Sequence, residues 1–344
     1  MASEPGLAPG SVIGGFYKIR RLIGQGGMGE VYAAEGRGGE KVALKLLHER
    51  AAQDPDLVAR FNREADIAKK IASPFVAAIL GSGKERDGRL WIAFERLVGE
   101  GLDERLRREQ YLSFAEVAPI VEDSLQGLHA AHGAHVVHRD IKPANLFIEK
   151  RKLTPEEIQA GDHEERTRIL DFGVSKMKAN AASRRSEPSL TAFDATLGSF
   201  AYMAPEQVRG SARVDERADL YALGAVAFRA LTGRLPFEGS NALTLIALKL
   251  DRDPPTLAQT TGDTWPKEIE KYLAKIMARE REKRFGSAVD ALDAWRKVCR
   301  VMGNARRRAP PPPPPSFSMR DDRTEVTSAS FTDAALGSPP TRRR

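Results

Sequence analysis

A glycine-rich run near the N-terminus is the first segment whose residue types and spacing suggest chemistry. Gly24-Gln25-Gly26-Gly27-Met28-Gly29-Glu30-Val31 has the spacing G-x-G-x-x-G-x-V, and the backbone amides of such a run can fold over phosphate groups. In a dinucleotide-binding protein this run would open a helix, whereas Val31-Tyr32-Ala33-Ala34 has the pattern of a strand. The run is therefore predicted to form a hairpin tip over phosphates, with a plain glycine-rich hairpin as the alternative.

A lysine inside an apolar strand is the second indication of chemistry. In Lys41-Val42-Ala43-Leu44-Lys45-Leu46-Leu47, alternation directs Val42, Leu44 and Leu46 to one face and Ala43, Lys45 and Leu47 to the other. Burial of an ammonium group is costly unless the group is paired. Lys45 therefore needs an anionic partner, which is either a ligand phosphate or a carboxylate.

A helix downstream of this strand offers the carboxylate. Its start is predicted at Asp54-Pro55, an N-cap residue followed by proline at the first helical position. Its apolar stripe consists of Leu57, Phe61, Ala68 and Ile71. Glu64 occupies the same stripe and Asp66 does not, so Glu64 is the predicted partner of Lys45. The alternative is that Glu64 lies at the edge of the stripe and meets solvent.

Three further motifs follow in order along the chain. They are His138-Arg139-Asp140-Ile141-Lys142-Pro143-Ala144-Asn145, Asp171-Phe172-Gly173 and Ala204-Pro205-Glu206. Together with the glycine-rich run and the strand of Lys45, they resemble the eukaryotic-like protein kinases over about residues 17–299. Three segments are similar to the bacterial branch of the serine/threonine protein kinases. They are the glycine-rich run, the motif of residues 138–145, hereafter the catalytic loop, and Tyr202-Met203-Ala204-Pro205-Glu206-Gln207.

The resemblance implies a role for each motif residue in phosphoryl transfer, which depends on positioning and charge neutralisation. Asp140 would accept or orient the substrate hydroxyl proton, and Lys142 would neutralise charge on the γ-phosphate of ATP. Asn145 and Asp171 would hold Mg²⁺, a hard ion that prefers oxygen ligands. The implied catalytic residues are thus Asp140, Lys142 and Asn145.

The resemblance also implies the residues that bind the nucleotide. Lys45 would reach the α- and β-phosphates and Glu64 would fix it, while Val31 and Ala43 would enclose adenine. The adenine edge would meet the backbone of residues 95–97, with Phe94 behind it. The full implied set is Ile23, Gly24, Gln25, Gly26, Gly27, Met28, Gly29, Glu30, Val31, Ala43, Lys45, Glu64, Glu95 and Leu97.

Several residues indicate the class of kinase. Lys142 and Gly198-Ser199 resemble serine/threonine kinases rather than tyrosine kinases. Asp219 resembles the aspartate that anchors the catalytic loop and Arg284 the arginine that pairs with Glu206, which disfavours a small-molecule kinase. A pseudokinase scaffold that binds nucleotide without catalysis is the alternative. It would be favoured by replacement of Lys45, Asp140, Asn145 or Asp171, and none of these is replaced.

The implied fold is α+β and bilobal. A small antiparallel-sheet N-lobe with one main helix would occupy about residues 13–97, and a larger, mostly helical C-lobe about residues 98–300. Residues 1–12 are expected to be flexible. Residues 301–344, with the proline run 310–315 and a Ser/Thr/Arg-rich end, are expected to be disordered because they have too little apolar surface to offset chain entropy.

Charge and cysteine content narrow the remaining function classes. The formal net charge of the 344 residues is 54 − 47 = +7, and residues 303–344 alone hold eight arginines against four acids. The basic residues elsewhere are dispersed without a recognition motif, so nucleic acid is not an expected partner. Apolar runs are too short for a membrane segment, and a single cysteine, Cys299, fits a reducing cytoplasm. Expected partners are protein substrates, with self-association for autophosphorylation.

Two local features depart from simple expectation. Asn145 and Asp171 are 26 positions apart (171 − 145), roughly twice the family separation, so an insertion is predicted. Thr154-Pro155-Glu156-Glu157 predicts a short helix within it, as neutral surface decoration or alternatively a docking element.

His129, His132, His135 and His138 recur every third residue. Gly133 should end the helix and Val136-Val137 is predicted to be strand, so these imidazoles are not expected to form a metal site.

Overall fold

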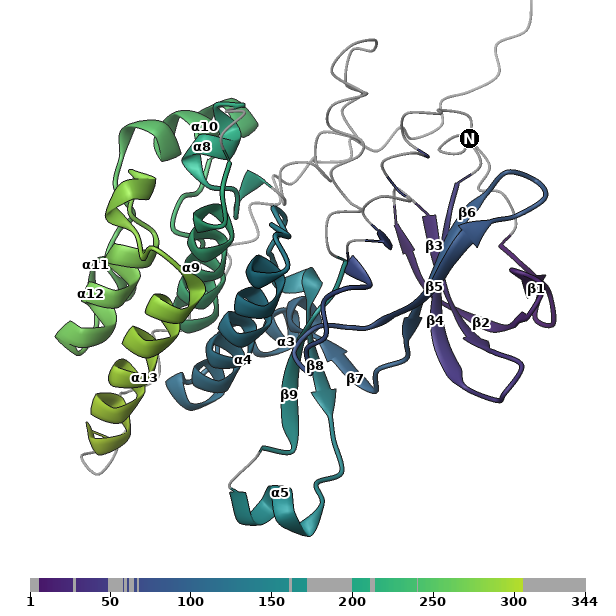
Figure 1. Ribbon diagram of the computed structural model, residues 1–344. Helices are drawn as coiled ribbons and strands as arrows, with labels where there is room; N and C mark the ends of the chain where they lie inside the picture. Colours follow the sequence, from purple (N-terminus) through teal and green to yellow (C-terminus); the bar gives the residue numbers. More distant parts are fainter. Residues whose placement is uncertain are drawn as a thin grey trace, which may run out of the picture. The chain divides into compact units, whose positions relative to one another are not determined.

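The N-terminal part of the chain is an antiparallel sheet of six strands, in the order β1-β2-β3-β4-β6-β5. The computed structural model describes residues 6–26, 29–48, 58, 61, 65–66, 68–160, 163–171, 200–210, 214–239 and 241–305. The strands are β1 (Val12–Ile13), β2 (Tyr17–Gly26), β3 (Gly29–Glu35), β4 (Lys41–Leu47), β5 (Ile79–Lys84) and β6 (Leu90–Glu95). Figure 1 shows them together in purple and blue.

The two faces of β4 belong to different parts of the core, as the alternation predicts. Val42, Leu44 and Leu46 lie in one buried cluster with Tyr17, Ile19 and Trp91. Leu47, on the opposite face, packs in a second cluster with Phe61 and Leu90. Of the predicted helix after Asp54, the described residues 58, 61, 65–66 and 68 are helical. Phe61 and Ala65 are fully buried, so this helix covers the face of the sheet that carries Leu47.

A second, three-stranded sheet contacts the segment that precedes β5. It contains β7 (Gly99–Gly101), β8 (Leu146–Lys150) and β9 (Glu165–Ile169) in that order. Ile169 forms a parallel bridge with Val76, and its backbone N–H donates to the Phe75 carbonyl at 2.8 Å. The insertion lies between β8 and β9, where α5 (Pro155–Ala160) forms the predicted short helix at the end of the hairpin (Figure 1).

The remainder of the described chain is mostly helical. The helices are α3 (Leu102–Glu109), α4 (Phe114–Gly133), α8 (Pro205–Val208), α9 (Arg217–Thr232), α10 (Ala242–Asp251), α11 (Leu257–Thr261), α12 (Lys267–Ile276) and α13 (Ala288–Ala305), with short 3₁₀ turns at Pro143–Asn145 and Arg281–Lys283. Ser113 and Glu116 form a capping box that starts α4. Helix α9 is buried along most of its length and is the centre of the largest apolar cluster.

The end of the helical region lies beyond the expected boundary. Helix α13 continues through Ala305, past the boundary predicted at residue 300. Val298 is buried, and Cys299 and Met302 pack against the core, which explains why the helix does not end earlier. The proline-rich segment falls outside the described residues. Among the helices that the structure describes, none combines the length and the apolar character needed to cross a membrane.

Candidate active site

Lys45 lies on the partly exposed face of β4 and forms an ion pair with Asp171. Its Nζ is 2.6 Å from Asp171 Oδ2, although the two residues are 126 positions apart. Cross-strand pairing places Val31 opposite Lys45, and Ala33 opposite Ala43. Because opposite residues of an antiparallel pair share a face, Val31, Ala43 and Lys45 line one side of the sheet. The requirement of Lys45 for an anionic partner is therefore met by a carboxylate.

Asp171 follows β9 in a conformation that is uncommon for a residue with a side chain. Its φ is 54°, in the left-handed region. Removal from solvent raises its pKa, but the Lys45 ammonium, with smaller effects of His138 and Lys142, outweighs this and lowers the pKa overall. Asp171 is therefore held as a carboxylate, the form that a cation requires.

Asp140, Lys142 and Asn145 are brought together by the loop between α4 and β8. Lys142 Nζ is 2.9 Å from Asp140 Oδ2. Asn145 Nδ2 donates to the backbone oxygen of Asp140 at 2.7 Å and to its Oδ2 at 3.2 Å. Asp140 and Asn145 are 8% and 7% exposed, so both are fixed but reachable. Since the amide nitrogen of Asn145 is used, its oxygen is the atom free to face a cation.

Asn145 also lies next to the strand that ends at Asp171. The N–H of Leu170 donates to the backbone carbonyl of Asn145 at 2.9 Å. Asn145 and Asp171 thus offer an amide oxygen and a carboxylate from adjoining segments, a donor set that fits Mg²⁺.

Asp219 anchors the backbone that precedes Asp140, as the family resemblance implies. It is fully buried in the first turn of α9. Its Oδ1 accepts from the N–H of Arg139 at 2.6 Å, and its Oδ2 accepts from the N–H of His138 at 2.8 Å and from His132 Nε2 at 3.0 Å. A buried carboxylate with three donors is well satisfied, so this contact holds the loop firmly.

The histidines of the predicted repeat have separate surroundings. His132 contacts Asp219, whereas His138 donates from Nε2 to the Leu170 carbonyl at 2.8 Å. The prediction of a strand at Val136-Val137 is wrong, because these residues are irregular in the structure. The neighbouring backbone groups bond to Asp219 and to the end of α4 instead of to a ladder.

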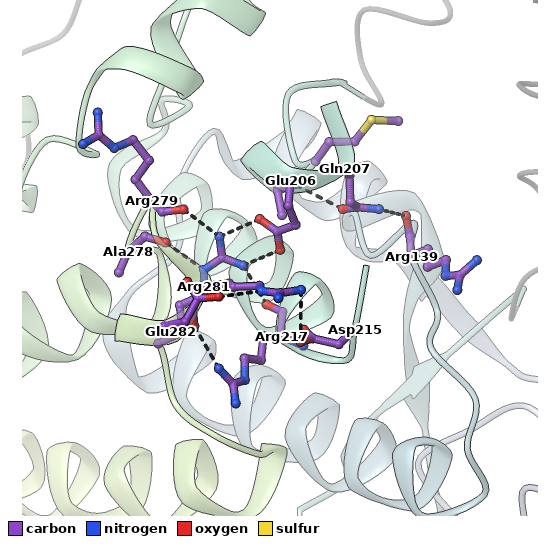
Figure 2. A network of polar contacts seen from close by, with 12 residues as sticks. Arg139, Glu206, Gln207, Asp215, Arg217, Ala278, Arg279, Arg281 and Glu282 are labelled. Carbon is purple, nitrogen blue, oxygen red and sulfur yellow. Dashed lines mark hydrogen bonds and ion pairs between the residues drawn. The ribbon is translucent and has the colours of Figure 1, made fainter. Parts of the chain in front are cut away.

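Glu206 and Arg284 form the predicted ion pair, which fixes the start of α8. Arg284 donates to both carboxylate oxygens, at 2.7 and 2.9 Å. It also donates to the carbonyls of Arg217, Ala278 and Arg279. Figure 2 shows Glu206 within this network and, beside it, Gln207 reaching to the carbonyl of Arg139.

Lys249 of α10 is a buried lysine that the sequence analysis did not single out. Its Nζ donates to the carbonyls of Ala201 at 2.7 Å and Met203 at 2.9 Å, in the segment before α8. It also lies over the rings of Tyr221 and Phe237. Burial lowers the pKa of Lys249 to about 7. In the sequence, Lys249 is one position of a mostly apolar helix and carries no motif. Only its tertiary contacts identify it as a residue that holds the segment before α8.

The end of β6 and the residues after it contain the two residues predicted to meet adenine, Glu95 and Leu97. The Glu95 carboxylate accepts from the N–H of Ala78 at 2.7 Å and forms an ion pair with the buried Arg168 of β9. Arg168 further contacts Glu149 and the Val76 carbonyl. Neither backbone polar group of Leu97 bonds to another described residue, so both can hydrogen-bond an incoming base. The Arg168 link was not anticipated from the sequence.

The glycine-rich run forms the predicted hairpin. Gly24 pairs with Val31, Gln25 with Glu30 and Gly26 with Gly29. A Cβ on Gly29 would lie 2.1 Å from the Leu46 carbonyl oxygen, so only glycine fits there. The continuous strand after Gly29 excludes a dinucleotide-binding loop that opens a helix. Gly27, Met28 and Glu64 fall outside the described residues, and their roles stay predictions.

Comparison with known proteins identifies the family. The protein kinase domain family matches residues 17–295. Among curated relatives, the serine/threonine-protein kinase pkn3 of Myxococcus xanthus is 34% identical over 87% of this chain and 52% of that protein. The serine/threonine-protein kinase PknF of Mycobacterium tuberculosis is 37% identical over 83% of this chain and 56% of that protein. The chain thus spans about half the length of these relatives.

Solved structures agree with this assignment. The crystal structure of the Mycobacterium tuberculosis PknI kinase domain is similar with a TM-score of 0.63 and 28% identity, covering 85% of this chain and 99% of that one. The likeness confirms the predicted α+β kinase fold, with its antiparallel sheet and its helical region. The chain therefore belongs to the protein kinase family, in the bacterial group of eukaryotic-like serine/threonine kinases.

Proposed function

We propose that this chain transfers the γ-phosphate of ATP to serine and threonine hydroxyls of proteins. The observation that carries the proposal is the convergence of Lys45, Asp140, Lys142, Asn145 and Asp171 from distant segments. Phosphoryl transfer needs cations around the phosphates and a carboxylate beside the attacking hydroxyl, and this set provides both.

The residues take the roles that the family resemblance implies, and the contacts of the described residues support these roles. Lys45 binds the α- and β-phosphates, and Asp171 with Asn145 holds Mg²⁺, which neutralises the charge of the triphosphate when bound. Asp140 orients the acceptor hydroxyl and accepts its proton, while Lys142, 2.9 Å from Asp140, steadies the γ-phosphate. Val31 and Ala43 enclose adenine from the sheet, and the backbone of residues 95–97 bonds its edge. The glycine-rich run from Ile23 to Val31 covers the phosphates, and Glu64 supports Lys45 when nucleotide is bound.

The proposed partners and cellular compartment follow from the proposed phosphoryl transfer and from the cysteine content. The partners are protein substrates, including a second copy of the chain for autophosphorylation. A reducing compartment that supplies ATP suits a chain with one cysteine, so we place the activity in the cytoplasm.

The experiment is a transfer assay with the full chain, Mg-ATP and a generic basic protein. Asp140→Asn and Lys45→Met should each reduce phosphate incorporation by orders of magnitude. Asp293→Asn, at an exposed position of α13, is the matched control and should leave transfer unchanged. Equal incorporation by wild type and Asp140→Asn would refute the proposal. Nucleotide binding without transfer by wild type would establish the pseudokinase alternative.

A further inference from the structure

Arg139, which directly precedes Asp140, has an unusual backbone. Its φ is 64°, in the left-handed region that residues with a Cβ rarely adopt. Such a conformation persists only where the surroundings hold it. Because Asp140 is the next residue, the conformation of Arg139 fixes the peptide group from which Asp140 extends.

Side chains from two different helices hold the backbone of Arg139. Asp219 Oδ1, on α9, accepts from its N–H at 2.6 Å. Gln207 Nε2, on α8, donates to its carbonyl oxygen at 2.9 Å. Figure 2 shows the Gln207 amide between α8 and the Arg139 carbonyl, while the Arg139 guanidinium extends away from it. Both backbone polar groups of Arg139 are thus bound, one on each side of its Cα.

The Gln207 amide is itself fixed. Its Oε1 accepts from the N–H of Ala204 at 3.1 Å, so oxygen and nitrogen both have partners and the amide has one orientation. Glu206, the preceding residue, is held by two hydrogen bonds from Arg284. The donor to Arg139 therefore stands on a turn that cannot easily shift.

Helix α11 shows that a glutamine can cap a helix through its amide oxygen while its amide nitrogen donates to no other described residue. Gln259 of α11 stands at the same position of a capping box, where its Oε1 accepts from the N–H of Thr256 at 2.9 Å. Its amide nitrogen has no hydrogen-bond partner among the described residues, so the side chain forms no hydrogen bond with the described part of the catalytic loop. The bond from Gln207 to Arg139 is thus an addition to the cap.

We infer that Gln207 is a positioning residue, which holds Asp140 in its reactive orientation through the Arg139 carbonyl. The inference rests on the proposed phosphoryl transfer, in which Asp140 orients the acceptor hydroxyl. It also links the segment before α8, which Lys249 holds through Ala201 and Met203, to the catalytic loop. A change at the turn of Gln207 is then transmitted to Asp140 through one hydrogen bond.

Two substitutions test separately the acceptor oxygen and the donor nitrogen of the Gln207 amide. Gln207→Glu keeps the acceptor for Ala204 but replaces the donor with an oxygen that repels the Arg139 carbonyl. Gln207→Lys keeps a donor for Arg139 but lacks the acceptor for Ala204. Gln259→Glu is the matched control, because it makes the same change in a cap without the additional bond.

The experiment measures kcat and KM for ATP and a peptide substrate, the melting temperature, and hydrogen exchange of residues 136–142 in the full chain. Gln207→Glu should lower kcat at least tenfold with KM for ATP within twofold and with a melting temperature close to that of Gln259→Glu. Exchange of residues 136–142 should become faster in this variant only. Gln207→Lys should melt at a lower temperature yet retain more kcat than Gln207→Glu.

Two results would overturn the inference. One is unchanged exchange and kcat within twofold of wild type in Gln207→Glu. The other is a loss of activity that follows the melting temperature across both Gln207 variants, because that result indicates a purely structural cap. If wild type transfers no phosphate, the proposed function fails, and the exchange measurement alone then decides whether Gln207 holds the loop.

Discussion

The guanidinium of Arg284 and the carboxylate of Glu206 form a doubly hydrogen-bonded ion pair across 78 positions of sequence. The Arg284 side chain has no solvent exposure and that of Glu206 has 12%. Removal from water is costly for both charges, so each depends on the other. The pair ties α8, which carries Gln207, to the loop before α13.

Removal of one partner of this pair should strongly destabilise the helical region. Arg284→Met should lower the free energy of unfolding by about 3–5 kcal/mol, because Glu206 is left as an unpaired buried charge. The comparison is Arg296→Met, which breaks the exposed pair of Arg296 with Glu122 and should cost less than about 1 kcal/mol. Urea denaturation measures both. Equal stability of the two variants would contradict the assigned burial of the pair.

Asp123 of α4 predicts a pH dependence of stability. It accepts from the N–H of Thr167 at 2.8 Å beside a pocket of about 360 Å³, and burial raises its pKa to about 6. Between the ordinary pKa of 3.8 and about 6, the folded state holds a proton that the unfolded state has released. Stability due to this group is therefore present at low pH and is lost as the pH rises through this window.

Asp123→Asn removes this titration while an amide oxygen still accepts from Thr167. At pH 7 the variant should be more stable than wild type by roughly 1–3 kcal/mol, and the difference should vanish below about pH 4. Unfolding curves from pH 4 to 8 measure it. Asp293→Asn is the exposed control, and a pH-independent difference for Asp123→Asn would contradict the prediction.

The insertion between β8 and β9 should be dispensable for peptide phosphorylation, as expected of surface decoration. The structure shows where a deletion must stop, because Arg105 donates to both carboxylate oxygens of Glu165 in β9. Deletion of residues 153–162 keeps this ion pair and should leave kcat/KM for a peptide within twofold. Deletion of residues 152–165 should destabilise the fold, and Glu165→Gln should reproduce part of that loss. Impaired phosphorylation of one partner protein only would show a docking role for the insertion.

Phosphorylation of the segment between Asp171 and Glu206 should activate the enzyme. Its serine and threonine residues fall outside the described residues. We expect Arg139 to receive the phosphate, because Arg139 is exposed and its guanidinium forms no ion pair with a described residue. A phosphate of about −1.5 to −2 charge would bind there. Autophosphorylation is predicted at Thr191 or Thr196, and the double alanine variant should lose activity severalfold. Phosphate mapping that finds this segment unmodified, with full activity of the double variant, would refute the prediction.

The C-terminal boundary predicts what truncation does. A chain that ends at Ala305 keeps all of α13 and should retain full transfer and thermal stability, because the proline-rich remainder is proposed to be dispensable. A chain that ends before Val298 loses the contacts of Val298, Cys299 and Met302 with the core and should melt at a lower temperature. Loss of activity on removal of residues 306–344 alone would show that the tail contributes to the kinase domain.

Local patterns in the sequence determined the elements and most of the chemistry. The alternation of residues 41–47 separated the two faces of β4, because side chains alternate whenever a strand forms. Thr154-Pro155 predicts α5, because capping acts within a few residues. The apolar run of residues 220–231, which Arg229 interrupts, is typical of a buried helix such as α9. The ordered motifs named Lys45, Asp140 and Asp171 as reactive groups.

Only the tertiary structure decided which of these groups meet. Lys45 with Asp171, Arg168 with Glu95 and Gln207 with Arg139 are pairs far apart in the chain. Their contacts depend on how β9, α8 and the catalytic loop pack, and no local periodicity encodes that packing. The wrong prediction at Val136-Val137 also shows that local sequence patterns do not encode tertiary contacts. Two β-branched residues favour a strand, but the buried carboxylate of Asp219 binds the backbone beside them and holds it as an irregular loop.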